Sequence, residues 1–104
     1  MSEPERGILV SMHAVDRYRR RNNIPREPLR QTEQRISDCI RLAISEGRIF
    51  NHKPNGFLLY GEKRKQLPSE QRFVQCDESY GFIIRRAPGE DIVLTMLSKA
   101  GVRR

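Results

Sequence analysis

The sequence predicts an α+β domain in which two N-terminal helices pack on a three- to four-stranded antiparallel β-meander. Apolar residues recur at helical spacing before Gly47, whereas short β-prone runs separated by turn formers follow it. A chain of 104 residues is also too short for two separate cores. We therefore expect a single domain over residues 1–104, with frayed ends at 1–6 and 99–104.

A short apolar run and a basic helix come first. Residues 7–10 (GILV) fit either a first strand or a packed segment that leads into the helix. Ser11 offers a side-chain oxygen to cap the helix, and residues 12–22 contain no Gly or Pro. The helix should end at Asn22–Asn23, before Ile24–Pro25.

The second helix should begin with Pro28 in its first turn and end before Gly47, because a left-handed glycine often terminates a helix. Its apolar residues recur at three- and four-residue steps and so share one face: Leu29, Ile36, Cys39, Ile40 and Ala43. We expect this face to pack on the sheet.

The rest of the chain consists of short β-prone runs and turns. The runs are RIF (48–50), FLLYGE (57–62), RFVQCD (72–77), YGFIIRR (80–86) and DIVLTMLS (91–98). The stretches DESYG and APGED have the residues that close hairpins. The charged stretch KRKQLPSEQ is expected to be an exposed loop.

The charge of the chain narrows the choice of partners. The net charge is +7 and the isoelectric point is about 10.1, which favours nucleic acid first and acidic membrane surfaces second. No apolar run approaches the roughly 20 residues that a membrane span needs. The N-terminus MSEPERG has no apolar signal-peptide core, so we expect a cytoplasmic protein with no membrane partner.

Cysteine and histidine are sparse. Cys39 and Cys76 are too few for a disulfide scaffold, and small core residues are their usual role in a reducing compartment. Together with His13 and His52 they show no metal-ligand spacing, so we expect no metal site and no cofactor.

The first helix carries the best candidate site. At 100° per residue, Ala14, Val15 and Tyr18 gather on one side. The other side collects His13, Arg17, Arg20 and Arg21. An imidazole can serve as a general base, and guanidinium groups match phosphate with paired hydrogen bonds. The alternative is an ordinary basic helix face that is only solvated.

Further cations and a tyrosine extend this set. Arg85 and Arg86 are adjacent strand residues that point to opposite faces, so only one can join a given site. Tyr80 could stack on a base or donate a proton, although packing is the usual role of a strand tyrosine. The candidate nucleic-acid-binding residues are Arg17, Arg20, Arg21, Lys63, Arg64, Lys65 and Arg86.

One sequence pattern resembles a known family. The pattern S-x-H-A-x-x-R-Y opens the first helix (Ser11, His13, Ala14, Arg17 and Tyr18), AISEGRIF ends the second, and I-x-x-T (Ile92 to Thr95) lies in the last run. This order resembles the small RelE/BrnT-like toxin proteins and their uncharacterised relatives, in the barnase–EndoU–colicin–RelE fold group. The resemblance covers about residues 8 to 98.

The resemblance implies a toxin-type endoribonuclease that cleaves RNA, often translated messages, without a metal and through the 2′-hydroxyl. It also implies control by an antitoxin, here expected to be acidic. The residues expected to be catalytic are His13, Arg17, Tyr80 and Arg85. Two alternatives stay open: a non-catalytic nucleic-acid-binding protein, and a phage- or plasmid-encoded inhibitor that binds another protein.

Overall fold

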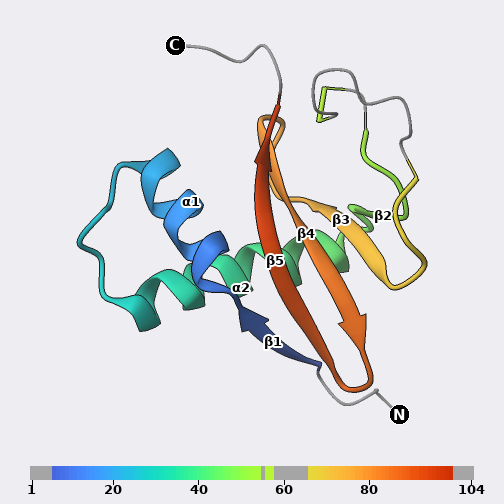
Figure 1. Ribbon diagram of the computed structural model, residues 1–104, viewed down its shortest axis with the longest axis horizontal. Helices are drawn as coiled ribbons and strands as arrows, with labels where there is room; N and C mark the ends of the chain where they lie inside the picture. Colours follow the sequence, from blue (N-terminus) through green and yellow to red (C-terminus); the bar gives the residue numbers. More distant parts are fainter. Residues whose placement is uncertain (1–5, 55, 58–65, 100–104) are drawn as a thin grey trace.

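The computed structural model describes residues 6–54, 56–57 and 66–99, which form two helices and a five-stranded sheet (Figure 1). In chain order the elements are β1 (Gly7–Val10), α1 (Met12–Asn22), α2 (Leu29–Ser45), β2 (Ile49–Phe50), β3 (Gln71–Gln75), β4 (Tyr80–Ala87) and β5 (Glu90–Ser98). The strand order across the sheet is β1-β5-β4-β3-β2, so the first and last strands lie side by side.

β1 makes the sheet mixed. It runs parallel to β5, with Gly7 opposite Glu90 and Val10 opposite Val93, whereas β2 to β5 pair antiparallel. The α+β class is confirmed, and β2 to β5 form a four-stranded antiparallel meander. The expectation of three to four strands, all antiparallel, misses the fifth strand, β1, which is parallel to β5. The open edge of β5 pairs with a segment about 80 residues earlier in the chain, and no local sequence pattern signals such a parallel pairing.

The start of α1 and the ends of both helices lie where the capping and turn residues of the sequence predict them. The Ser11 hydroxyl accepts a hydrogen bond from the Ala14 N–H at 3.1 Å and so caps the start of α1. Asn23 follows α1 with a φ of 57°, a left-handed conformation that asparagine tolerates. Gly47 follows α2 with a φ of 79°, and its N–H donates to the Ile44 carbonyl at 3.0 Å.

The buried face of α2 differs from the prediction at one position. Ile36 and Ile40 are fully buried, but Leu29 is 40% exposed. Thr32 is buried one turn later, where its hydroxyl donates to Glu27 Oε1 at 2.8 Å. A buried hydroxyl with a hydrogen-bond partner carries little penalty, so a polar residue can occupy this position.

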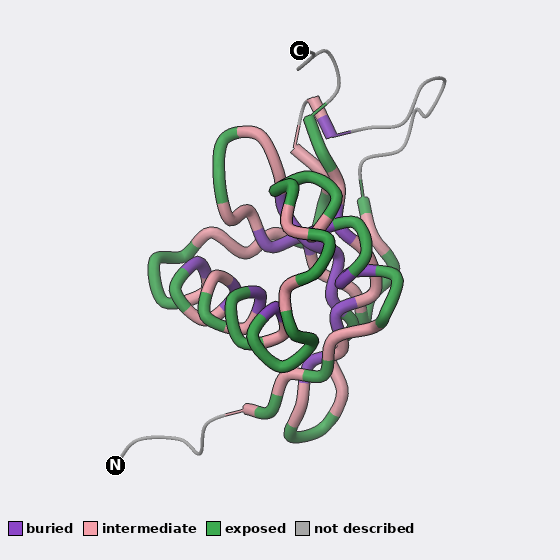
Figure 2. The backbone as a smooth tube through the Cα atoms, turned by 90° about the vertical axis from the view of Figure 1, so that its left-hand side faces the viewer, coloured by how far each residue is buried: buried purple, intermediate pink, exposed green. Residues whose placement is uncertain are grey.

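The helices lie on one face of the sheet, and most of the core lies between these two layers (Figures 1 and 2). This cluster comprises Ala14, Val15, Tyr18, Ile36, Ile40, Ala43, Val74, Phe82, Ile84, Val93 and Met96. A second, smaller cluster on the other face comprises Phe57, Phe73 and Ile83. Figure 2 shows the buried stretches on the strands and along one side of each helix.

Tight turns connect the last three strands. The Asp77 carboxylate accepts a hydrogen bond from the Ser79 N–H at 3.0 Å between β3 and β4, and Gly89 turns with a φ of 77° between β4 and β5. Phe57, which begins the expected run FLLYGE, is buried, whereas residues 58–62 lie outside the described part of the chain. Neither α1 nor α2 has the length and apolarity to cross a membrane.

Candidate nucleic-acid interface

α1 divides into a buried side and a basic side. Ala14, Val15 and Tyr18 are buried against the sheet and α2. The opposite side is exposed and carries His13, Arg17, Arg20 and Arg21. We call Arg17, Arg20 and Arg21 the arginine face. Because α1 is anchored by its apolar side, these guanidinium groups are held at the surface by a rigid element.

The arginine face borders a depression of about 330 Å³ at the junction of α1 and β5, lined by Arg17, Arg20, Arg21, Met96 and Ser98. Arg17 Nε donates to the Met96 carbonyl at 2.9 Å. This bond holds the Arg17 side chain across the end of β5 and leaves its two terminal nitrogens for other acceptors.

Arg21 is positioned by the start of β4. Its guanidinium donates to the Ser79 hydroxyl and lies over the Tyr80 ring, with Cζ 5.0 Å from the ring centroid. The Tyr80 hydroxyl turns inward, 3.9 Å from Cys39 Sγ, and burial raises its pKa. Tyr80 therefore presents one ring face to Arg21 rather than its hydroxyl to the solvent.

His13 and Arg20 are exposed on the outer side of α1. His13 lies in the first turn, four residues before Arg17, so the two side chains are neighbours on the helix surface. Neither His13 nor Arg20 makes a side-chain polar contact with any residue that the structure describes. Both groups are accessible to a ligand without first breaking an internal bond.

The strand arginines lie away from the arginine face. On β4, Phe82 and Ile84 belong to the core under the helices, whereas Ile83 belongs to the cluster on the other face. The same alternation places Arg86 on the helix side and exposed Arg85 on the face without helices.

The four residues expected to be catalytic are only partly brought together. His13 and Arg17 share α1, and Tyr80 reaches the same region through Arg21. Arg85 lies five residues from Tyr80, roughly 16 Å along β4, and on the opposite face. One hollow holding all four side chains is not formed.

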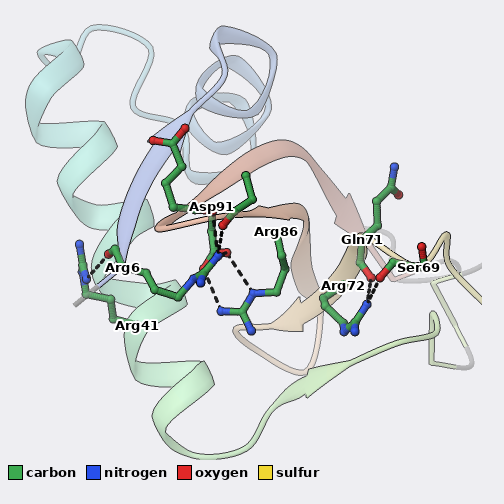
Figure 3. Close-up of polar contacts among 9 residues, drawn as sticks. Arg6, Arg41, Ser69, Gln71, Arg72, Arg86 and Asp91 are labelled. Atoms are coloured by element: carbon green, nitrogen blue, oxygen red, sulfur yellow. Dashed lines mark hydrogen bonds and ion pairs between the residues drawn. The ribbon is translucent and has the colours of Figure 1, made fainter. Parts of the chain in front are cut away.

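Arg86 belongs to a separate cluster around Asp91 (Figure 3). The Asp91 side chain is 2% exposed and accepts hydrogen bonds from Arg86 Nε and Nη2, both at 3.0 Å. Arg6 Nε and Nη2 donate to the same carboxylate at 3.2 and 3.0 Å, and Arg41 donates to the Arg6 carbonyl at 3.1 Å. Figure 3 shows Arg6 and Arg86 both pointing toward Asp91.

The Asp91 cluster is an internal ion network that ties β1 to the β4–β5 hairpin. Burial alone would raise the pKa of Asp91, but the hydrogen bonds from Arg86 and Arg6 outweigh burial and lower it. Arg86, a candidate nucleic-acid contact, thus already donates its hydrogen bonds to the Asp91 carboxylate. Arg6, expected in a frayed end, is held in place by the same carboxylate.

Sequence reasoning missed the β-strand side of the depression. Met96 contributes a backbone carbonyl, and Ser98 also lines the depression, at the end of β5. Both residues lie about 80 positions from α1 in the chain, and no sequence spacing indicates this approach. Arg19, the remaining arginine of the RYRRR run, is structural, because its Nη2 donates to the Glu27 carbonyl at 2.6 Å.

Three of the candidate nucleic-acid-binding residues, Lys63, Arg64 and Lys65, lie outside the described residues. Comparison of the chain with models of known protein families, with characterised proteins and with solved structures finds no match. The resemblance to RelE/BrnT-like toxins therefore stays a prediction.

Proposed function

We propose that this protein binds the phosphate backbone of RNA through the arginine face of α1. The observation that carries the proposal is the convergence of Arg17, Arg20 and Arg21 on one depression at the protein surface. The net charge of +7 adds a long-range attraction for a polyanion.

The hydrogen-bonding state of each arginine supports this proposal. Arg17 uses Nε on the Met96 carbonyl, and Arg21 uses one terminal nitrogen on Ser79, so both keep donors for phosphate oxygens. Arg20 keeps all of its donors. Two of the three side chains are also held in place by their internal bonds, which reduces the entropy lost on binding.

Ser98 supports RNA over DNA as the ligand. Ser98 lines the depression together with the three arginines. It stands two positions after Met96 on β5, so the side chains of Ser98 and Met96 point to the same face of the sheet. A serine hydroxyl can exchange a hydrogen bond with a ribose 2′-hydroxyl, the group that distinguishes RNA from DNA. RNA was also the substrate implied by the sequence resemblance.

The test is a binding titration of single-stranded RNA and DNA of the same sequence across a range of salt concentrations. Each lost phosphate contact should reduce the slope of log K against log salt by about 0.7. Arg20→Ala should therefore reduce it by about 0.7, and Arg17→Ala with Arg20→Ala by about 1.4. Ser98→Ala should reduce the ratio of the affinity for RNA to the affinity for DNA.

Arg85→Ala is the matched control, because it removes an exposed arginine from the face without helices. Its affinity and salt slope should stay close to those of the unmodified chain. If Arg85→Ala lowers the slope as much as Arg20→Ala, the contact surface is not the arginine face. If neither RNA nor DNA binds, the proposal is wrong, and a protein partner becomes the better hypothesis.

RNA cleavage is a second candidate function, supported by the exposed position of His13 beside Arg17. The imidazole could take the proton of a 2′-hydroxyl while Arg17 holds the adjacent phosphate. The distant position of Arg85 counts against the full set of catalytic residues, so we place binding before cleavage.

Labelled RNA incubated with the protein in EDTA tests the cleavage hypothesis. Cleavage through the 2′-hydroxyl would leave 2′,3′-cyclic phosphate ends, and His13→Ala should abolish them without unfolding the chain, since His13 is exposed. RNA that binds but stays intact would support the non-catalytic alternative. Cleavage that survives His13→Ala would exclude His13 as the base.

A further inference from the structure

A pocket of about 230 Å³ lies between the end of α2 and the strands around Asp91. Ile8 of β1 and Ile44 of α2 form apolar walls, and Arg6, Arg86 and Asp91 line the same space. Ile8 and Arg86 are both direct neighbours of Asp91 across the sheet, so these three side chains point to the helix side. We call this space the Asp91 pocket. It shares no lining residue with the depression beside the arginine face.

Both arginines of the ion network keep a hydrogen-bond donor for a ligand. Arg6 and Arg86 each donate to Asp91 through Nε and Nη2. The other terminal nitrogen of each, Nη1, makes no hydrogen bond with a residue that the structure describes. The bonds to Asp91 also hold both guanidinium groups in place, so less side-chain entropy is lost when a ligand binds.

The charge of the network favours an anion. Two guanidinium groups bond one carboxylate, so Arg6, Arg86 and Asp91 together carry a net positive charge. The Asp91 side chain is almost fully buried, whereas the side chains of both arginines are partly exposed. An incoming anion therefore meets the guanidinium groups and not the carboxylate.

We propose that the Asp91 pocket binds a small monocarboxylic acid with an apolar body. The carboxylate accepts charge-assisted hydrogen bonds from Nη1 of Arg6 and Arg86, and the hydrocarbon body covers Ile8 and Ile44. The pocket is smaller than the roughly 300–1,000 Å³ of sites for drug-sized ligands, which limits the acid to about ten non-hydrogen atoms. The proposal does not depend on RNA binding, because the arginine face takes no part in it.

Benzoate is the probe, and three related compounds separate its two parts. Benzamide keeps the ring but has no charge, whereas acetate and inorganic phosphate are charged but have almost no apolar body. The ¹⁵N-labelled full chain is titrated with each compound at constant ionic strength, and backbone amide and arginine Nε signals are followed by NMR.

For benzoate we expect saturable shifts at the amides of Ile8 and Ile44 and at the Nε groups of Arg6 and Arg86, with a Kd on the order of 1 mM. Benzamide, acetate and phosphate should each bind at least about tenfold more weakly, since each lacks one of the two kinds of contact.

Four results would overturn the proposal. Acetate or phosphate that binds as tightly as benzoate would mean that the apolar walls take no part, and benzamide that binds as tightly would mean the same for the arginines. Benzoate shifts confined to α1 and the end of β5 would place the anion at the arginine face instead. The absence of any saturable shift would mean that the pocket binds no such acid.

Two pairs of variants locate the site. Arg6→Gln should weaken benzoate binding about fivefold or more, because it removes one guanidinium group. Arg30→Gln makes the same change on α2 outside the pocket lining and should leave the Kd unchanged. Ile44→Ala should weaken binding about threefold by removing part of the apolar wall, whereas Leu42→Ala, at an exposed position of the same helix, should not.

Circular dichroism establishes that each variant is folded, and the pair Ile44→Ala and Leu42→Ala decides the location if Arg6→Gln unfolds the chain. Control variants that weaken benzoate binding as much as their matched variants would refute this location of the site.

Discussion

Replacing Asp91 by asparagine should destabilise the fold strongly, because this carboxylate organises two arginines. The substitution keeps the volume of the side chain but removes its charge and replaces one acceptor oxygen by a donor. Arg86 and Arg6 both donate to Asp91, and the latter bond ties the residue before β1 to the start of β5.

The magnitude follows from the burial of the three side chains. Removing one partner of a buried ion pair costs about 3–5 kcal/mol. The Asp91 side chain is 2% exposed, but those of Arg6 and Arg86 are 38% and 33% exposed and stay partly hydrated. Solvent screening lowers the expected loss to about 2–3 kcal/mol, which corresponds to a decrease in Tm of roughly 10–20 °C for a domain of this size.

The effect should depend on pH with a defined sign. The folded state lowers the pKa of Asp91, so its stabilisation is complete above the unfolded value of about 4 and is lost as the pH falls through the folded value. The difference in Tm between the unmodified chain and Asp91→Asn should therefore be largest near neutral pH. It should shrink steadily below about pH 4.

Thermal unfolding followed by circular dichroism from pH 7 to pH 2 measures this difference. Glu90→Gln is the control, because it makes the same change of charge at the neighbouring residue. The Glu90 carboxylate makes no hydrogen bond or ion pair with a residue in the described ranges, so this variant should change stability by less than about 0.5 kcal/mol. A decrease in Tm below about 3 °C for Asp91→Asn, or a difference that does not change with pH, would refute this account of the network.

Three further substitutions test the fold. Gly81→Ala should lower the free energy of unfolding in urea by about 2 kcal/mol or more. The added Cβ would overlap the buried Phe73 ring and lie 2.5 Å from the Val74 carbonyl oxygen. Unchanged stability would mean that Gly81 is not packed against Phe73. Ser11→Ala should remove about 1 kcal/mol by deleting the α1 cap, and an unaltered urea midpoint would contradict the cap. Ile40→Asp should unfold the chain, since it buries an unpaired charge at a fully buried site; a folded, dispersed protein by size exclusion would disprove the α2 core assignment.

The helices and turns could be predicted because their determinants are local. The Ser11 cap, the apolar spacing of α2 and the turn residues around Gly89 all act within a few positions along the chain. Leu29 is the exception on α2. It has the right spacing, but it lies at the end of the helix, where the core does not reach it.

The basic side of α1 could also be predicted, since helical geometry alone separates Arg17 from Tyr18. The residues that contact those arginines could not be predicted from the sequence. Met96 and Tyr80 reach Arg17 and Arg21 from β5 and β4, and only the packing of α1 on the sheet decides which strand ends it meets.

What the sequence by itself determined is the α+β class, the limits of both helices and the charged surface of α1, because each depends on neighbours within one or two turns of the chain. What only the tertiary structure decided is the parallel β1–β5 edge and the burial of Asp91 between two arginines. Those contacts join residues far apart in sequence, and their formation depends on which surfaces the whole fold brings together.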